Sequence, residues 1–435
     1  MKSEASSLSK SQWWVLVVAC LGWMFDTFDQ RLFILARAPA MAKLLPASSD
    51  VIAQTQASTW MTAIFIAGWA TGGLIFGFYG DRLGRVRTMA ITITVYSLFT
   101  GLSATAQGLW DFAFYRFLTG LGIGGEFAAG AALIAEILPA KVRPYALGLM
   151  QATAVLGTLL GTICSLFIEV TATYAGVDGW RLLFVIGALP ALVLIPLRMK
   201  VRESDAWLAT REQARRGQLT LGGFRALFKL PWRRASLVGI ALGFSGQLGI
   251  WAIGTWSPEL MRLVMASEGY LSAAERSRVI GGGLILKDLA SAFGIILFTW
   301  AAERYGRRPA FAVSFVSSIA AVLICFGGMR ETAQIWWMMP LLGLTVWSVL
   351  GGFSLYFPEL FPTSLRASGI GLCYNVARYL TAAGILGMGQ LLTLFAGAGF
   401  SQSLRPAAIL LSTGYLLGLG VLWWAPETKG EPLPS

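Results

Sequence analysis

Carboxylate side chains occur inside a stretch of this chain that is otherwise apolar. Asp26 and Asp29 lie in the segment "WMFDTFDQRLFILARAPAM" and, three residues apart, would share one face of a helix. If the segment crosses a membrane, a charge near the bilayer centre costs at least about 2.5 kcal/mol, so such residues face a cavity or a partner. A buried carboxylate that gains and loses a cationic partner binds protons with an affinity that depends on conformation. The spacing therefore predicts proton-coupling chemistry at these two aspartates.

Two further charged residues of the first half, Arg116 and Glu126, are candidates for the same chemistry. Counting about 1.5 Å per residue, Asp26 and Asp29 lie roughly 20 to 25 Å from the start of their span, and Arg116 lies about 9 Å from the opposite surface. Because these depths coincide, we expect Arg116 to pair with one of the aspartates and Glu126 to relay protons. One alternative is a fixed structural pair of Asp26 and Arg116. In that case Asp29 would neutralise Arg31, and Glu126 would be hydrogen-bonded between packed helices.

The charges buried in the second half are mainly basic. "LILKDLAS" and "CYNVARYL" place Lys287 and Arg378 inside apolar stretches. A cation in a low-dielectric cavity is a natural partner for a carboxylate, and the planar arginine fork can bind both carboxylate oxygens. Alternatively, Lys287 and Asp288 satisfy each other. The residues expected to bind a small carboxylate are Arg378, Lys287, Asn375, Tyr374, Gln247 and Trp347.

The composition places the chain in a membrane. Of its 435 residues, 56% are hydrophobic and 13% are charged, and the mean hydropathy is +0.66, which is outside the range of soluble proteins. The net charge of +12 comes from short basic clusters between apolar stretches, so it indicates membrane topology and not nucleic-acid binding. The four cysteines lack metal-ligand spacing and the chain has no histidine, so we expect no metal and no cofactor, with protons as the coupling ion.

Twelve apolar stretches are long enough to cross a bilayer as helices of about 20 residues. Basic residues concentrate after the even-numbered stretches, so the positive-inside rule predicts that both termini lie in the cytoplasm. The expected location is the cytoplasmic membrane, with the protein present as a monomer among the lipids. The predicted spans are residues 12–37, 57–79, 88–107, 110–136, 145–170, 180–197, 235–262, 281–302, 309–329, 334–358, 366–395 and 404–424.

Three short patterns recur in the two halves of the chain. "GDRLGR" matches "AERYGR" at an offset of 222 residues, "AEILPAKVR" matches "PELFPTSLR" at 223, and Glu203 matches Glu427 at 224. An ordered set at nearly constant offset indicates an internal duplication. The predicted domains are an N-terminal six-helix bundle over 1–197, a cytoplasmic linker over 198–234 and a C-terminal six-helix bundle over 235–435.

The chain resembles the major facilitator superfamily along its whole length. The resemblance rests on "GFYGDRLGR", which includes Gly77, Gly80 and Asp81, on "YRFLTGLGIGGE" and on the terminal "PETKG". It implies an all-α membrane protein with twelve transmembrane helices in two pseudo-symmetric six-helix bundles, in which substrate is reached alternately from each side. In the second repeat, Thr299 and Ala302 stand where glycines would be expected, which predicts a less tight turn there.

Two groups within the superfamily are similar to the first and fourth spans. "FDT" followed by "YRFLTG" resembles the aspartate and arginine patterns of proton-coupled sugar porters, matching Asp26 and Arg116. "FDTFDQRLFILARAPAM" more closely resembles the opening span of proton symporters for aromatic acids, sialic acid and other carboxylates, matching Asp26, Asp29 and Pro39. Both resemblances imply proton-coupled transport.

The repeated loop charges are expected to stabilise a gate without contacting substrate. Asp81 lies at the end of the second span, where it can pair with an arginine and face a helix N-terminus. We expect Glu136 to pair with Arg143, and Glu359 with Arg366, in the same way. The predicted gating residues are Asp81, Arg82, Gly84, Arg85, Glu136, Arg143, Glu303, Arg304, Arg307, Glu359 and Arg366.

These observations favour proton-coupled symport of a small, monocarboxylate-like organic anion by alternating access, because the acidic half and the basic half each have a task. A proton-coupled sugar or polyol symporter is the alternative, although sugar sites rely on amides and aromatic rings and leave Lys287 and Arg378 unexplained. A sensor built on the same fold is a third class. An enzyme is not expected, since the sequence has no nucleophile elbow, phosphate-binding lysine loop or metal cluster.

Overall fold

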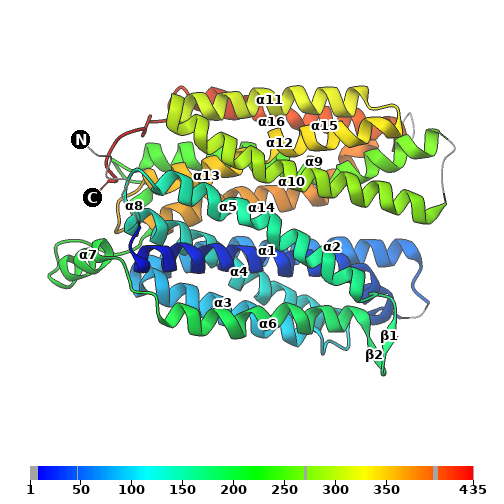
Figure 1. Cartoon of the computed structure of the whole chain (residues 1–435), viewed down its shortest axis with the longest axis horizontal. Coiled ribbons are helices and arrows are strands. Elements are labelled where there is room, and N and C mark those ends of the chain that lie inside the picture. Colours follow the sequence, from blue (N-terminus) through cyan, green and yellow to red (C-terminus); the bar gives the residue numbers. More distant parts are fainter. Residues whose placement is uncertain (1–7, 47, 269–271, 395–399, 435) are drawn as a thin grey trace. The chain divides into compact units, whose positions relative to one another are not determined.

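The computed structural model describes residues 8–46, 48–268, 272–394 and 400–434, and these residues fold almost entirely into helices (Figure 1). Among them, nine helices are long and apolar enough to cross a membrane. A helix satisfies its backbone hydrogen bonds internally, which a lipid environment requires. The structure therefore confirms the prediction of an all-α membrane protein.

The chain divides into two compact units. Among the described residues, the first unit contains 8–229, 358–372 and 432–434, and the second contains the remainder. The segment 358–372 comes from the second repeat of the sequence but belongs to the first unit. Residues of both repeats therefore meet inside the first unit.

The first unit is built from six long helices and a polar linker. Ser9 forms a capping box with Gln12 at the start of the first helix, and Asp50 accepts a 2.7 Å hydrogen bond from the Ala53 amide at the start of the second. An antiparallel hairpin lies between the fifth and sixth long helices. The elements are α1 (Lys10–Leu44), α2 (Val51–Leu83), α3 (Arg85–Ser103), α4 (Leu109–Ile137), α5 (Arg143–Phe167), β1 (Thr173–Tyr174), β2 (Val177–Asp178), α6 (Gly179–Met199), α7 (Asp205–Arg215) and α8 (Phe224–Leu227).

Helices of the first unit approach one another closely at small residues. α2 and α3 both pack against α4, and α3 also packs against α6 (Figure 1). A side chain at Gly72 of α2 would collide with the backbone of Leu121 in α4, so this contact requires glycine. A side chain at Gly22 of α1 would collide with Glu126 and Arg198. The interior of the unit therefore has room for these two charged side chains but for little else.

The second unit contains most residues of the remaining long helices, around an apolar core, while the segment 358–372 of these helices belongs to the first unit. Val322, Cys325, Met339 and Leu342 are among the core side chains that are fully buried. The tenth and twelfth predicted spans are each divided between two consecutive helices, and residue 395, the predicted end of the eleventh, lies outside the described residues. The elements are α9 (Arg233–Ser267), α10 (Ala273–Tyr305), α11 (Arg307–Gly328), η1 (Thr332–Gln334), α12 (Ile335–Val346), α13 (Val349–Glu359), α14 (Arg366–Leu394), α15 (Phe400–Ser412) and α16 (Gly414–Val421).

The two repeated turns have the same backbone geometry. Gly84, between α2 and α3, has φ 106° and ψ 155°, and Gly306, between α10 and α11, has φ 106° and ψ 162°. Residues with a side chain rarely adopt this φ, so both turns require glycine. The prediction of a less tight second turn is wrong, because Thr299 and Ala302 lie inside α10 and not at the turn itself.

Candidate functional site

The first buried charge pair lies between α1 and α4. The carboxylate of Asp29 and the guanidinium of Arg116 are 3.7 Å apart, and both side chains are completely buried. Thr100 donates a 2.7 Å hydrogen bond to Asp29, and Arg116 donates to Ser103 at 3.0 Å and to Thr119 at 2.9 Å. The pair is therefore held by hydroxyl groups of α3 and α4 as well as by its own charges.

The ion-pair partner of Arg116 in the structure is Asp29. The structural alternative, a fixed pair of Asp26 and Arg116, is not the ion pair seen here. The two aspartates are one helical turn apart, a difference too small for depth estimates from residue counting to resolve. Arg31 donates a 3.0 Å hydrogen bond to Thr162 of α5, and the idea that Asp29 neutralises Arg31 stays a prediction. Asp26 is fully buried in α1.

The second buried pair joins α4 to the end of α6. Glu126 and Arg198 form an ion pair in which both guanidinium nitrogens contact the carboxylate, one of them at 2.9 Å. Arg198 also donates to the Met89 carbonyl oxygen at 2.7 Å, and Thr92 donates to Glu126 at 3.1 Å. Glu126 is thus hydrogen-bonded between packed helices, as the structural alternative proposed. Its role as a proton relay stays a prediction. Sequence reasoning missed Arg198 because it placed this residue in the linker, whereas α6 continues to Met199.

In the second unit, the two predicted cations lie against aromatic rings. The ammonium of Lys287 is 4.1 Å from the centroid of the Trp347 ring, and the guanidinium of Arg378 is 4.3 Å from the centroid of the Tyr374 ring. Lys287 also forms a 2.6 Å ion pair with Asp288, as the alternative reading of "KD" proposed. Arg378 and Lys287 are 3% and 7% exposed. Each cation is therefore desolvated and stabilised in part by a ring face.

The other predicted substrate residues, Asn375, Tyr374 and Gln247, lie on α14 and α9. Arg378 donates a 3.0 Å hydrogen bond to Asn375, and Gln247 accepts a 3.0 Å hydrogen bond from the Trp251 indole. One turn from Gln247, α9 approaches α14 closely, because a side chain at Gly243 would come within 2.4 Å of the Cys373 carbonyl oxygen. The structure thus brings Arg378, Asn375 and Tyr374 together on α14, as their spacing in the sequence predicted, and places Gln247 on the neighbouring helix α9.

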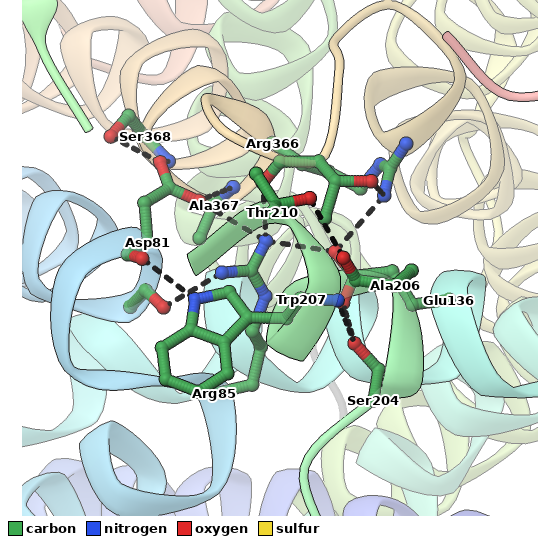
Figure 2. Close-up of polar contacts among 12 residues, drawn as sticks. Asp81, Arg85, Glu136, Ser204, Ala206, Trp207, Thr210, Arg366, Ala367 and Ser368 are labelled. Carbon is green, nitrogen blue, oxygen red and sulfur yellow. Dashed lines mark hydrogen bonds and ion pairs between the residues drawn. The ribbon is translucent and has the colours of Figure 1, made fainter. Parts of the chain in front are cut away.

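Four of the predicted gating residues form a compact network in the first unit, and Figure 2 shows Arg85 at its centre. One guanidinium nitrogen of Arg85 is 3.3 Å from Asp81 and 2.8 Å from Glu136. Arg366, from the second repeat, lies 2.9 Å from the same Glu136 oxygen. All four side chains are at most 1% exposed. Two carboxylates and two guanidinium groups therefore balance one another in a buried cluster.

The pairing of Glu136 with Arg143 and of Glu359 with Arg366 is wrong, because the partners are exchanged between the repeats. Glu136 pairs with Arg366, as well as with Arg85. Arg143 donates a hydrogen bond to the Leu138 carbonyl oxygen, and Glu359 is its charged neighbour. The sequence shows one glutamate and one arginine of this pattern in each repeat. It does not show whether a glutamate pairs with the arginine of its own repeat or with that of the other.

Asp81 binds the N-terminus of α14, as predicted. Its carboxylate accepts hydrogen bonds from the Ala367 and Ser368 amides at 3.0 and 2.9 Å, and from the Ser368 hydroxyl at 2.6 Å. A carboxylate at this position is stabilised by the helix dipole. α2 and α14 approach closely here, since a side chain at Gly77 would come within 2.8 Å of the Ala367 carbonyl oxygen. Asp81 thus fixes the start of α14 against α2.

The linker completes this network through α7 (Figure 2). The indole of Trp207 donates a 2.7 Å hydrogen bond to the Asp81 carbonyl oxygen, and the Ser204 hydroxyl donates to Glu136. Ser204 is also the N-cap of α7, because its hydroxyl oxygen accepts a 3.1 Å hydrogen bond from the Trp207 amide. Neither residue was predicted from the sequence, although a serine directly before a polar helix, as Ser204 is before Asp205–Arg215, is an N-cap signal.

The second copy of the loop repeats the scaffold in a more open setting. Glu303 forms a 2.6 Å ion pair with Arg307, and its side chain is 26% exposed. Glu427 accepts amide hydrogen bonds from Arg307 at 2.8 Å and Arg308 at 3.1 Å. Arg304 is exposed, and its carbonyl oxygen accepts a 3.0 Å hydrogen bond from Lys429.

The first copy has the same capping arrangement. Glu203 accepts amide hydrogen bonds from Arg85 at 2.9 Å and Val86 at 3.0 Å. Burial raises the pKa of the Glu203 carboxyl group, an effect that these amides only partly offset. Arg82 donates a 3.1 Å hydrogen bond to the Leu221 carbonyl oxygen and lies over the Phe78 ring. The linker is therefore attached to this turn at several points.

The chain is similar to known transporters. A family model described as "Sugar (and other) transporter" matches residues 31–226. A niacin transporter of Acinetobacter baylyi is 28% identical, over 99% of this chain and 98% of its own length. A sialic acid transporter of Escherichia coli is 28% identical, over 83% of this chain and 82% of its own length.

A solved structure has the same fold. It is that of a proton:xylose symporter of the major facilitator superfamily bound to 6-bromo-6-deoxy-D-glucose, and it superimposes with a TM-score of 0.75. The sequence identity is 20%, and the alignment covers 97% of this chain and 98% of the symporter. The likeness extends over both repeats and the linker between them.

Proposed function

Because this chain belongs to the major facilitator superfamily and is a membrane transporter, we propose that it carries a small organic anion together with protons by alternating access. The observation that carries the proposal is the similarity, along nearly the whole chain, to transporters named for niacin and sialic acid. Both of these compounds are carboxylic acids. A carboxylate is therefore the substrate class that we assign to this protein.

The basic groups of the second unit support a carboxylate as substrate. Arg378 presents a planar guanidinium, Asn375 and Tyr374 contact it, and Gln247 lies on the neighbouring helix α9. A guanidinium of this kind can bind both oxygens of one carboxylate, which a neutral sugar cannot use. The aromatic faces next to Arg378 and Lys287 are also suited to a flat, ring-bearing acid.

The acidic groups of the first unit supply the proton site in this proposal. Asp29 is fully buried and has Arg116 as its cationic partner at 3.7 Å. If Arg116 moves away during the transport cycle, the buried carboxylate must bind a proton to avoid the cost of an uncompensated charge. One proton entering with one monovalent carboxylate makes the step electroneutral. Asp26, one turn away, can share this role.

The network around Arg85 is the proposed gate at one end of the transport path. Its buried charges join the end of α2, the end of α4 and the start of α14. Alternating access requires such contacts to break and re-form in each cycle. Charge networks suit this task. Separating buried charges costs several kcal/mol, but the cost falls once water or new charged partners surround the separated groups.

A sugar or polyol is the second candidate substrate. It is favoured by the description of the matching family model and by the fold shared with the xylose symporter. In that case, Gln247 and Asn375 would bind hydroxyl groups, and Arg378 would have a structural role. The two candidates differ in whether transport depends on the charge at Arg378.

The test is uptake into proteoliposomes of labelled niacin, sialic acid, benzoate and xylose, with and without an inward proton gradient. We expect gradient-driven uptake of at least one carboxylate, and a loss of about 100-fold or more in Arg378→Gln, in which a bidentate contact is lost. Arg278→Gln, which removes an exposed arginine from the same unit, is the matched control. Gradient-driven uptake of xylose alone would establish the second candidate, and carboxylate uptake that ignores the gradient would refute the proton coupling.

A further inference from the structure

A groove lies on the surface of the second unit, between α11 and the end of α16. Its volume is about 520 Å³, and two charged side chains, Arg308 and Glu427, contribute to its wall. The rest of the wall is apolar and consists of Pro309, Ala312, Leu419, Leu422 and Trp423. The proposed transport of an organic anion does not use this groove.

The groove lies at a level where apolar spans end. The span Arg307–Gly328 begins beside it and the span Leu404–Val421 ends beside it. Trp423 and Trp424 follow that second span directly, and their side chains are 81% and 71% exposed. Exposed tryptophans are typical of the level at which lipid headgroups meet the acyl chains. The groove is therefore placed to contact both parts of a lipid molecule.

Two arginines from different helices bind the chain just after α16. The Nε atom of Arg308, on α11, donates a 2.9 Å hydrogen bond to the Leu422 carbonyl oxygen. The Nε atom of Arg234, on α9, donates a 2.8 Å hydrogen bond to the Trp424 carbonyl oxygen. Basic side chains commonly satisfy the last carbonyl groups of a helix in this way. Because the two acceptors are only two residues apart, both guanidinium groups lie at the same short segment.

Each of these guanidinium groups keeps its two terminal nitrogen atoms for a further ligand. Within the part of the chain that the structure describes, the Nη atoms of Arg308 and Arg234 make no hydrogen bond and no ion pair. The carboxylate of Glu427 accepts amide hydrogen bonds from Arg307, Arg308 and Lys429 and forms no ion pair with either arginine. A planar guanidinium fork matches the geometry of a phosphate group. The charge at this segment is thus complementary to an anionic headgroup.

We propose that the groove between α11 and α16 binds an anionic phospholipid. Its phosphate lies at the guanidinium groups of Arg308 and Arg234, and one acyl chain lies along Ala312 and Leu419. In phosphatidylcholine the same phosphate is accompanied by a choline ammonium group, so a lipid with a net negative charge binds more tightly. The site depends neither on the identity of the transported substrate nor on the coupling ion.

A lipid in this place joins three helices of the second unit. Arg234 belongs to α9, Arg308 belongs to α11, and both bind the segment that follows α16. α16 also packs against α9 and α11. Glu427, at the edge of the groove, caps the start of α11 directly after the turn at Gly306. The bound lipid therefore stabilises the second copy of the repeated turn.

The test is native mass spectrometry of the full chain in micelles, titrated with phosphatidylglycerol or with phosphatidylcholine. We expect tighter retention of phosphatidylglycerol by the wild type. In the double variant Arg308→Gln with Arg234→Gln, affinity for phosphatidylglycerol should fall by about fivefold for each arginine removed. Arg276→Gln with Arg278→Gln is the matched control, because it removes two exposed arginines of the same unit near the start of α10, at the other end of that helix from the repeated turn.

A second pair of variants changes the groove and leaves its charge and both arginine hydrogen bonds in place. Ala312→Phe fills the part of the groove assigned to the acyl chain, and we expect it to lose the bound phosphatidylglycerol. Val313→Phe is the control, because Val313 is the next residue of α11, is 67% exposed and does not line the groove. This pair separates loss of the lipid from loss of the helix-end hydrogen bonds.

Four results would overturn the inference. Equal retention of the two lipids by the wild type would show that the headgroup charge is not recognised. Unchanged binding in the double arginine variant or in Ala312→Phe would place the lipid outside this groove. An equal loss in the control with Arg276→Gln and Arg278→Gln would show a general effect of net charge. Displacement of the lipid by millimolar inorganic phosphate would assign the site to a soluble anion.

Discussion

The two repeats share a turn but differ in what surrounds it. Gly84 and Gly306 have the same φ of 106°, and Glu203 and Glu427 cap the helices that follow. Asp81 is completely buried against the start of α14, whereas the side chain of its counterpart Glu303 is 26% exposed. The duplication has therefore kept the scaffold of the turn in both copies, while the acidic residue beside the turn is fully buried in the first copy and partly exposed in the second.

The interiors of the two units also differ, because the compared helix is more polar in the first unit than in the second. One buried face of α3 carries four polar side chains, Thr92, Tyr96, Thr100 and Ser103. At an offset of 222, the matching positions of α11 are Ser314, Ser318, Val322 and Cys325. The last two belong to an apolar core with methionine and leucine side chains. Two buried cations of the second unit, Lys287 and Arg378, lie on other helices, α10 and α14. The four equivalent positions are buried in both units, but the last two are hydroxyl-bearing in α3 and are valine and cysteine in α11.

The largest expected effect is on stability, at Glu136. Glu136→Gln leaves the guanidinium groups of Arg85 and Arg366 without their shared carboxylate, and breaking a buried ion pair from one side costs about 3 to 5 kcal/mol. The matching change in the second repeat, Glu359→Gln, should cost much less, because that side chain is only partly buried. Denaturant unfolding in detergent micelles measures both. Equal losses would mean that the two repeats are not different in this respect.

The next effect is on transport, at the loop aspartate. Asp81→Asn weakens three charge-assisted hydrogen bonds to α14, and we expect initial uptake rates to fall about tenfold, which corresponds to about 1.4 kcal/mol. Glu303→Gln, the matched change in the second copy, should stay within about twofold, since partly exposed ion pairs contribute little. A larger loss in Glu303→Gln than in Asp81→Asn would reverse the assignment of the gate.

The smallest expected effect is the pH dependence of stability at Glu203. Burial raises the pKa of this carboxyl group in the folded protein, so the folded state binds its proton more tightly than the unfolded state does. The resulting stabilisation is complete below the unfolded pKa of about 4.3 and is lost as the pH rises through the folded value. Glu203→Gln should therefore reduce the fall in Tm between pH 4 and pH 7, by a few degrees at most.

A steeper fall in Glu203→Gln than in the wild type would contradict the sign of this shift. Glu427→Gln serves as the control for the loss of a capping carboxylate, because Glu427 binds the equivalent amides of the second copy. Measurements at two ionic strengths separate this titration from the general screening of surface charges.

The fold and the repeat could be predicted from the sequence, because hydropathy, basic clusters and a constant offset each act over many residues. The contact of Asp81 with a helix N-terminus could also be predicted, since it follows from where the carboxylate lies on α2. The three polar residues of α14 were found by helical spacing alone, which fixes the face of a helix to within one turn.

The partners of buried charges could not be predicted in the same way. Residue counting did not distinguish Asp26 from Asp29, because one turn of helix is smaller than the error of the count. The symmetry of the repeats made Arg143 and Arg366 equivalent candidates for Glu136, and only the packing of α14 against α2 selects Arg366. Arg198 lay beyond the predicted end of its helix, where no local pattern marks it as buried.

The exchange of partners between repeats has a consequence for the history of the gene. Glu136 and Arg366 come from different copies of the ancestral half, so the buried charge cluster is complete only when both halves are present. A half-length polypeptide ending near the linker would carry a carboxylate cluster that lacks one cation, and the other half would carry the orphaned arginine. We therefore expect the two halves to be stable as one molecule or as a tightly bound pair, and each half alone to be less stable.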